Sequence, residues 1–132
     1  MKIQRLGQKM AVCQLPAGES IPAWCQGEFT AVIRSPGELT VVCDQQQVPE
    51  HGLNSPLIRV ELDWIGFVID QVLDFGLVGV IAKLSRVMAD ANIPIFVISS
   101  YSTDYFLIRQ SFCELAVGRL VAAGYEVGQN HD

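Results

Sequence analysis

Residues 73–109 decide the fold, and they read LDFGLVGVIAKLSRVMADANIPIFVISSYSTDYFLIR. Within residues 75–91 the apolar side chains recur at helical spacing and the charged ones fall on the opposite side. Asp74 suits the N-cap of such a helix, Asn92 tolerates a left-handed stop, and Pro94 forbids continuation. The pattern therefore predicts one amphipathic helix, with sequence signals for both its start and its end.

Two β-rich runs follow this helix, residues 95–101 and 105–109, and the polar turn between them is short enough for a hairpin. Another apolar run, residues 64–69, precedes the helix and reads as a strand. We therefore expect the helix to lie across a sheet built from these three strands.

A last helix is predicted from Ser111 and Glu114, which are spaced as a capping box, to a stop at Gly124. Residues 125–127 can then add a closing strand. The helix is expected to bury four side chains, namely Cys113, Val117, Leu120 and Val121. The second half of the chain thus has the element order β, α, β, β, α, β.

The first half shows a weaker version of the same order. Its clearest part is a hairpin in which Pro36 and Gly37 have the chemistry of a type II turn. The predicted elements are a short strand over 10–13, a short helix over 21–25, strands over 29–34 and 39–43, one helical turn within 45–52, and a strand over 57–62.

The repeated order predicts two α+β modules, residues 1–63 and 64–132, with antiparallel sheets and helices on one face. A module of fewer than about 70 residues hides only about 60% of its unfolded surface. We therefore expect the modules to pack against each other or against a second copy.

Composition limits the class of partner. A net charge of −5 with scattered basic residues argues against nucleic acid, because binding to the phosphate backbone needs clustered Lys and Arg. No apolar run approaches the roughly 20 residues that cross a bilayer, and the first five residues lack a signal peptide's apolar stretch. We expect a cytoplasmic protein without a membrane partner.

Neither a metal site nor a catalytic site is predicted. The four Cys residues, at 13, 25, 43 and 113, form no CxxC pair, so buried thiols are favoured over zinc ligands. His51 and His131 are far apart in sequence, and the common motifs for nucleophilic, nucleotide-binding and metalloprotease sites are absent. We expect no cofactor and no enzymatic activity.

The element order resembles the ACT-domain family, together with the sequence of residues 73–81 and of residues 98–107. Within that family the chain is similar to small tandem proteins related to the CASTOR arginine sensors, and residues 33–43 resemble their first hairpin. The resemblance extends from about Gln8 to Val127. It implies a pair of ferredoxin-like modules that bind a small ligand, usually an amino acid, where two modules meet.

The resemblance also implies which residues line the pocket: Asp74, Phe75, Gly76, Leu77, Val78, Gly79, Ile98, Ser99, Ser100, Thr103 and Asp104. Asp104 would face a cationic group, and the free amides of a helix N-terminus would attract a carboxylate. Several of these residues have a structural alternative: Asp104 suits a tight turn, Asp74 a helix cap, the glycines close packing, and Ser99 and Ser100 an exposed strand end.

Two other functional hypotheses remain. The chain can be a ligand-free interaction module that acts through sheet pairing or as a homodimer. An enzyme is the less favoured hypothesis, because no catalytic constellation is visible in the sequence.

Overall fold

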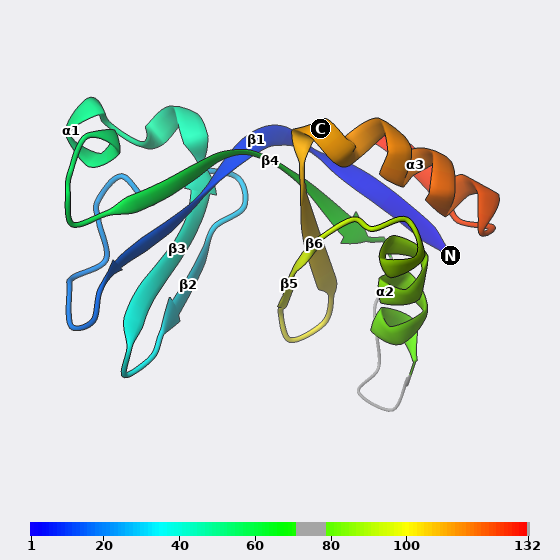
Figure 1. Cartoon of the computed structure of the whole chain (residues 1–132), viewed down its shortest axis with the longest axis horizontal. Coiled ribbons are helices and arrows are strands. Elements are labelled where there is room, and N and C mark those ends of the chain that lie inside the picture. The colour runs from blue at the N-terminus through cyan, green and yellow to red at the C-terminus, as the bar shows by residue number, and fades with distance from the viewer. Residues whose placement is uncertain (71–78, 132) are drawn as a thin grey trace. The chain divides into compact units, whose positions relative to one another are not determined.

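The computed structural model describes residues 1–70 and 79–131, and Figure 1 traces the whole chain. Within these residues the elements follow in the order β1 (Lys2–Pro16), β2 (Ala31–Arg34), β3 (Glu38–Asp44), η1 (Gln45–Gln47), α1 (Glu50–Leu53), β4 (Arg59–Ile69), α2 (Val80–Asp90), β5 (Phe96–Ser99), β6 (Asp104–Arg109), η2 (Gln110–Phe112), α3 (Cys113–Ala122) and β7 (Glu126–His131).

The chain forms two compact units. The continuous unit is Gln8–Trp64, and the discontinuous unit combines Met1–Gly7 with Ile65–Asp132. The long strands β1 and β4 are each divided between the two units: β1 after Gly7 and β4 after Trp64. The fold is a mixed α+β fold with mainly antiparallel strand pairing and few helices, which is consistent with an ACT or ferredoxin-like fold.

The discontinuous unit contains the predicted order β, α, β, β, α, β, formed by β4, α2, β5, β6, α3 and β7. Strands β5 and β6 make the expected antiparallel hairpin, in which Ser99 lies opposite Asp104. The start of β1 is added beside β4, where Asp70 N–H donates to Lys2 O at 3.0 Å, and β7 runs parallel to that part of β1. The closing strand therefore pairs with the first residues of the chain.

Both long helices of this unit cover the same face of its strands. The apolar side chains that meet there alternate along each strand, as a single sheet face requires. The Phe67 and Phe106 rings stack at its centre, with 5.1 Å between centroids. The other buried members are Ile3, Ile65, Leu84, Met88, Ile93, Ile108, Cys113, Ala116, Leu120 and Tyr125.

The predicted ends of the two helices are confirmed. Asn92 has a φ of 57° after α2, and Ile93 N–H donates back to Met88 O at 2.9 Å. Gly124 has a φ of 97° after α3, and the amide of Tyr125 returns to the helix in the same way. Both are Schellman motifs, in which a left-handed residue lets the next amide satisfy a terminal carbonyl.

The predicted helix starts need correction. The described part of α2 begins at Val80 with Gly79 as N-cap, whereas the expected cap Asp74 lies outside the described residues. The capping box at Ser111 is wrong, because the 3₁₀ turn η2 leads into α3 and makes Phe112 its N-cap. The predicted burial of Val121 is also wrong, since its side chain is 55% exposed and Ala116 is buried in its place.

The continuous unit has the strand order β2-β3-β1-β4. Its predicted hairpin is confirmed, with Arg34 opposite Leu39. The type II turn is wrong, because Gly37 lacks the positive φ that this turn requires at its third position. Instead Ser35 N–H donates to Glu38 O at 3.0 Å, and the Ser35 hydroxyl also bonds the Glu38 backbone.

Other first-half predictions differ from the structure in length or type. The strand expected over 10–13 is the 15-residue β1, and residues 21–25 form a turn closed by Cys25 N–H to Pro22 O rather than a helix. The helical turn expected within 45–52 is present as η1, followed by α1.

Strands expected over 57–62 and 64–69 are one strand, β4, that bends at Asp63. Asp63 has a φ of 63°, and Gln45 holds it by accepting from its amide at 2.7 Å and donating to Oδ1 at 3.2 Å. The polar residue that looked like a break in the sequence is therefore a left-handed residue within a continuous strand.

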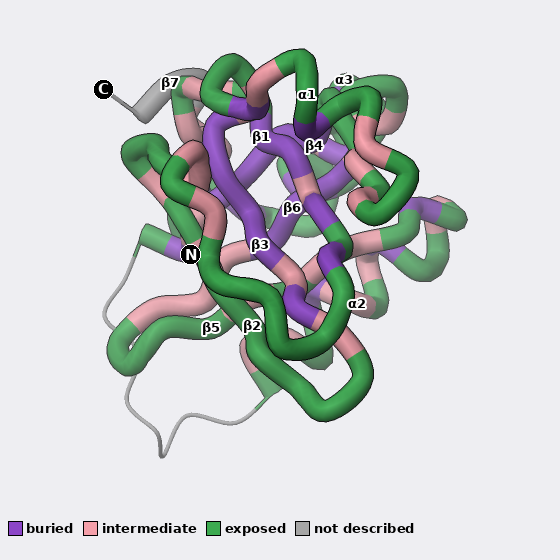
Figure 2. The backbone as a smooth tube through the Cα atoms, turned by 90° about the vertical axis from the view of Figure 1, so that its left-hand side faces the viewer, coloured by how far each residue is buried: buried purple, intermediate pink, exposed green. Residues whose placement is uncertain are grey.

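The core of the continuous unit lies between its strands and the segment that follows β3. Figure 2 shows buried residues gathered along β1 and β3, whereas β2 is largely exposed. Its buried members are Ala11, Cys13, Leu15, Leu39, Val41, Cys43 and Val48.

Candidate functional site

The structure brings the predicted hairpin residues together at one end of the β5–β6 hairpin. Ile98 and Ser99 end β5, Ser100 and Thr103 belong to the turn, and Asp104 opens β6. The Ser100 amide and hydroxyl both donate to Thr103 O, at 2.8 and 3.1 Å. This closes the turn with backbone and side-chain hydrogen bonds.

Asp104 is half-buried, and its position differs from the turn position that the sequence suggested as the structural alternative. It lies in the last cross-strand pair, where Ser99 Oγ donates to Asp104 Oδ1. Among the described residues no other side chain pairs with this carboxylate. Its remaining acceptor capacity can take a cationic donor, and the Ser99 hydroxyl fixes its orientation.

Gly79 is exposed and has a φ of 85° as the N-cap of α2. A Cβ built on it meets no atom within 4 Å, so its conformation rather than close packing calls for glycine. Gly79 O accepts from Lys83 N–H at 2.9 Å, which starts the helix. The other predicted residues of this loop, Asp74, Phe75, Gly76, Leu77 and Val78, lie outside the described residues.

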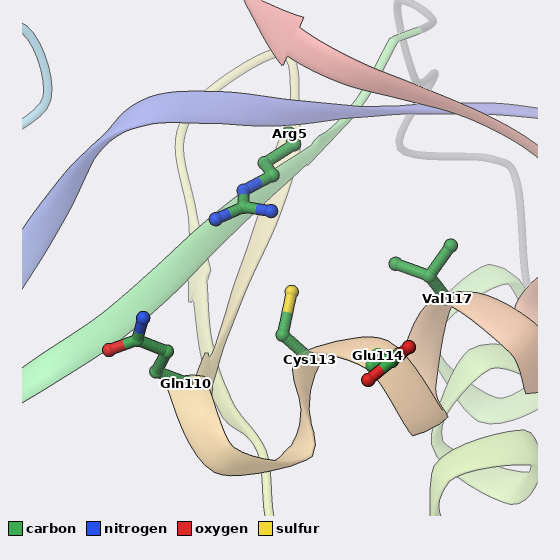
Figure 3. A pocket seen from close by; sticks show the side chains of 5 residues that line it. All are labelled: Arg5, Gln110, Cys113, Glu114 and Val117. Carbon is green, nitrogen blue, oxygen red and sulfur yellow. The ribbon is translucent and has the colours of Figure 1, made fainter.

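A pocket of about 370 Å³ lies elsewhere in the discontinuous unit, between β1 and the first turns of α3. In Figure 3 the Arg5 side chain extends from β1 toward the start of α3, and the Cys113 thiol points from α3 toward β1. The pocket is lined by Arg5, Gln110, Cys113, Glu114 and Val117. One cation, one anion, a primary amide, a thiol and a valine thus face the same space.

Sequence reasoning missed this pocket entirely. Arg5 and Cys113 are more than a hundred residues apart, and only the pairing of β1 with β4 and β7 places Arg5 near α3. The local sequence gives no sign of it, because residues 2–9 lack the alternating pattern of a strand although they form the first part of β1.

The three thiols of the continuous unit lie close enough to influence one another. Cys13 and Cys43 are fully buried and their thiols are hydrogen-bonded, which lowers the pKa of Cys13 and raises that of Cys43. Burial raises the pKa of Cys25, whose thiol donates to Val42 O at 3.8 Å. Within the described part of the chain, no three His, Cys, Asp or Glu side chains are placed to hold a metal ion.

Among the helices of residues 1–70 and 79–131, none is long and apolar enough to cross a bilayer.

Comparison with known families divides the chain into two matched segments. Residues 59–121 match the family model described as ACT domain. Residues 8–51 match a second model, described as an N-terminal domain. No curated protein sequence matches the chain.

Solved structures share the fold over nearly the whole chain. A crystal structure of a protein from Agobacterium tumefaciens is 27% identical with a TM-score of 0.88, and the match covers 99% of this chain and 94% of that one. A Vibrio cholerae protein of unknown function, described as a possible transport protein, is 17% identical with a TM-score of 0.67, covering 98% and 88%.

The regulatory subunit of aspartate kinase from Thermus thermophilus, in its ligand-free form, is 13% identical with a TM-score of 0.62, and the match covers 89% of this chain and 93% of that one. At such identities the last two likenesses show the fold alone. The family match shows that residues 59–121 of this chain are similar to an ACT domain.

Proposed function

We propose that the chain is a regulatory protein that senses a small zwitterion, an amino acid, and has no catalytic activity of its own. The observation that carries this proposal is the ACT domain match over residues 59–121. A fold shared with the regulatory subunit of aspartate kinase supports it. The finer relation to CASTOR-type proteins, with residues 1–63 as a second ACT-like module, belongs to the same proposal.

The ligand site of this proposal includes the end of the β5–β6 hairpin. Asp104 would accept from the ligand's ammonium group while Ser99 holds the carboxylate in place. Ile98, Ser100 and Thr103 would line the site beside it, and Gly79 leaves open space at the start of α2. A charged hydrogen bond of this kind accounts for orientation as well as affinity.

One feature favours a second candidate function, an interaction module that pairs with another copy. Strand β2 forms the edge of the continuous unit's sheet, and Val32 and Ile33 are 41% and 47% exposed on it. Exposed apolar edge strands readily pair with another chain. Sedimentation of the purified protein with and without amino acids separates the two functions, because only a sensor responds to ligand.

Asp104→Asn is expected to weaken binding of the sensed amino acid about tenfold to a hundredfold, since a hydrogen bond to a charged group contributes about 1.5 to 3 kcal/mol. The ligand is first identified by a thermal-shift screen over the twenty amino acids, because a ligand at a hundred times its Kd stabilises by about 2.7 kcal/mol. Titration calorimetry then compares the variant with the wild type.

Asp90→Asn is the matched control, because Asp90 is an exposed acid on α2 that pairs with Arg86 on its own helix. It should leave affinity unchanged. Equal binding by the wild type and Asp104→Asn would place the site elsewhere, and stabilisation by none of the amino acids would contradict the proposed function itself.

A further inference from the structure

Arg5 is a charged residue on the side of β1 that faces the core. Ile3, two residues earlier, is fully buried among residues of α2 and α3. Side chains two apart on a strand point to the same face, so Arg5 continues this face past the edge of the apolar cluster. Its side chain is half-buried there.

The pairing of β1 with β7 is irregular at Arg5. Gln4 lies opposite Gly128 but Leu6 lies opposite His131, so β7 spans one residue more than β1 over this step. Such bulges are uncommon between parallel strands, and the extra residue here lies in β7 rather than in β1. Here the irregularity coincides with the residue whose side chain lines the pocket.

The Arg5 guanidinium has no anionic partner within residues 1–70 and 79–128, where the ion pairs present do not include it. Removing a charge from water is costly unless it is paired. The guanidinium of Arg suits bidentate binding of a carboxylate or phosphate. Glu114 lines the same pocket without forming an ion pair with Arg5. The two opposite charges are therefore both available to a third molecule.

The remaining lining fixes the size and polarity of that molecule. The volume of about 370 Å³ falls in the range of small-molecule sites. Val117 and the Cys113 thiol supply an apolar wall, and Gln110 supplies one amide that can both donate and accept.

We propose that this pocket is a ligand site for an aliphatic amino acid or a similar small zwitterion. The guanidinium of Arg5 binds the ligand's carboxylate, Glu114 accepts from its ammonium group, and the aliphatic side chain packs on Val117 and Cys113. The ligand class is the same as that of the proposed function. The site, however, is separate from the Asp104 hairpin and does not depend on that hairpin.

Alkylation of Cys113 reports on binding in the pocket, because a ligand packed against this thiol slows its reaction. The probes are valine, leucine, isoleucine and methionine. The protein is treated with iodoacetamide in the presence of each probe, and peptide mapping measures the alkylation of all four cysteines. At least one probe is expected to slow alkylation at Cys113 several-fold and leave Cys25, in the continuous unit, unchanged. Calorimetric titration of the same probes measures affinity independently of thiol reactivity.

Analogues that lack one charge test the two polar contacts. For leucine, leucinamide removes the carboxylate and N-acetyl-leucine removes the ammonium charge. Each is expected to bind about tenfold to a hundredfold more weakly, since each loses one charge-assisted hydrogen bond.

Arg5→Gln should weaken binding by the same factor, because the amide keeps a polar group at this position but carries no positive charge. Arg59→Gln is the matched control, because Arg59 is exposed on β4 and outside the pocket. Asp104→Asn should leave binding at this pocket intact, which separates it from the hairpin site. The melting temperature of each variant shows that the fold is retained.

The proposal is overturned if none of the four probes binds by calorimetry or protects Cys113, or if Arg5→Gln binds them as the wild type does. Binding that depends on Asp104 and not on Arg5 would remove this site and leave the proposed function standing. Binding that depends on Arg5 alone would establish this site without the hairpin.

Discussion

Phe106→Ala is expected to destabilise the protein by about 3 to 5 kcal/mol, a large part of the roughly 5 to 15 kcal/mol that keeps a typical domain folded. The Phe106 side chain is fully buried and stacks on Phe67, with the ring planes only 11° apart. Truncation removes the free energy gained by burying the Phe106 ring and leaves a cavity beside Phe67. The Phe67 ring cannot move to fill this cavity, because β4 fixes its position. Urea titration followed by circular dichroism measures the loss.

Tyr101→Ala is the matched control, since it removes another aromatic ring from the same hairpin region at a residue that is 83% exposed. Its effect should stay within about 0.5 kcal/mol. Equal effects of the two substitutions would contradict the position of Phe106 in the core.

Gly27→Ala is expected to cost about 2 to 5 kcal/mol, because it combines backbone strain with overpacking. Gly27 has a φ of 148°, which L residues rarely adopt, and a Cβ there would lie 3.0 Å from both the Cβ and the amide nitrogen of Asp44. Asp44 cannot move aside readily, since its amide donates to Gln26 O at 3.0 Å and its carboxylate accepts from Gln46 N–H. The same urea titration measures the change.

Gly37→Ala provides the comparison within the same unit. Gly37 has no positive φ, and a Cβ there meets nothing within 4 Å. Alanine at this position should be neutral or slightly stabilising, by up to about 1 kcal/mol, because it restricts the unfolded chain. A Gly27 variant as stable as the Gly37 variant would show that the backbone near Asp44 can relax.

Elements with a complete local signal were predicted well from the sequence. The stops at Asn92 and Gly124 depend only on a left-handed residue that follows an amphipathic run. The β5–β6 hairpin likewise needs only two apolar runs and a short polar turn. Such signals are carried within a few neighbouring residues.

Elements that depend on distant partners were predicted poorly. The first part of β1 has no clear alternation, and it becomes a strand because β4 and β7 pair with it. The capping box at Ser111 failed for a local reason, because the 3₁₀ turn η2 leads into α3 and places Phe112 at its N-cap. Local preference is overridden where tertiary pairing satisfies more backbone groups.

The candidate sites follow the same distinction. Ser99 and Asp104 are close in sequence, and the structure joins them by a hydrogen bond. The role assigned to them came from the family resemblance and stays a prediction. Arg5 and Cys113 meet only through the fold, so no pattern in the sequence could have grouped them.

The split of β1 between the two units has a consequence for the order in which the chain can fold. Met1–Gly7 is synthesised before its neighbours, which begin at Ile65 and include Glu126, whose amide donates to Met1 O at 3.1 Å. The continuous unit can assemble from residues that are near one another in sequence, whereas the discontinuous unit closes only after residues as far as Glu126 have been synthesised. Its contacts span the greatest sequence separation, which is the kind of pairing that forms slowly. A chain cut after Trp64 would leave the released second half without its inserted strand.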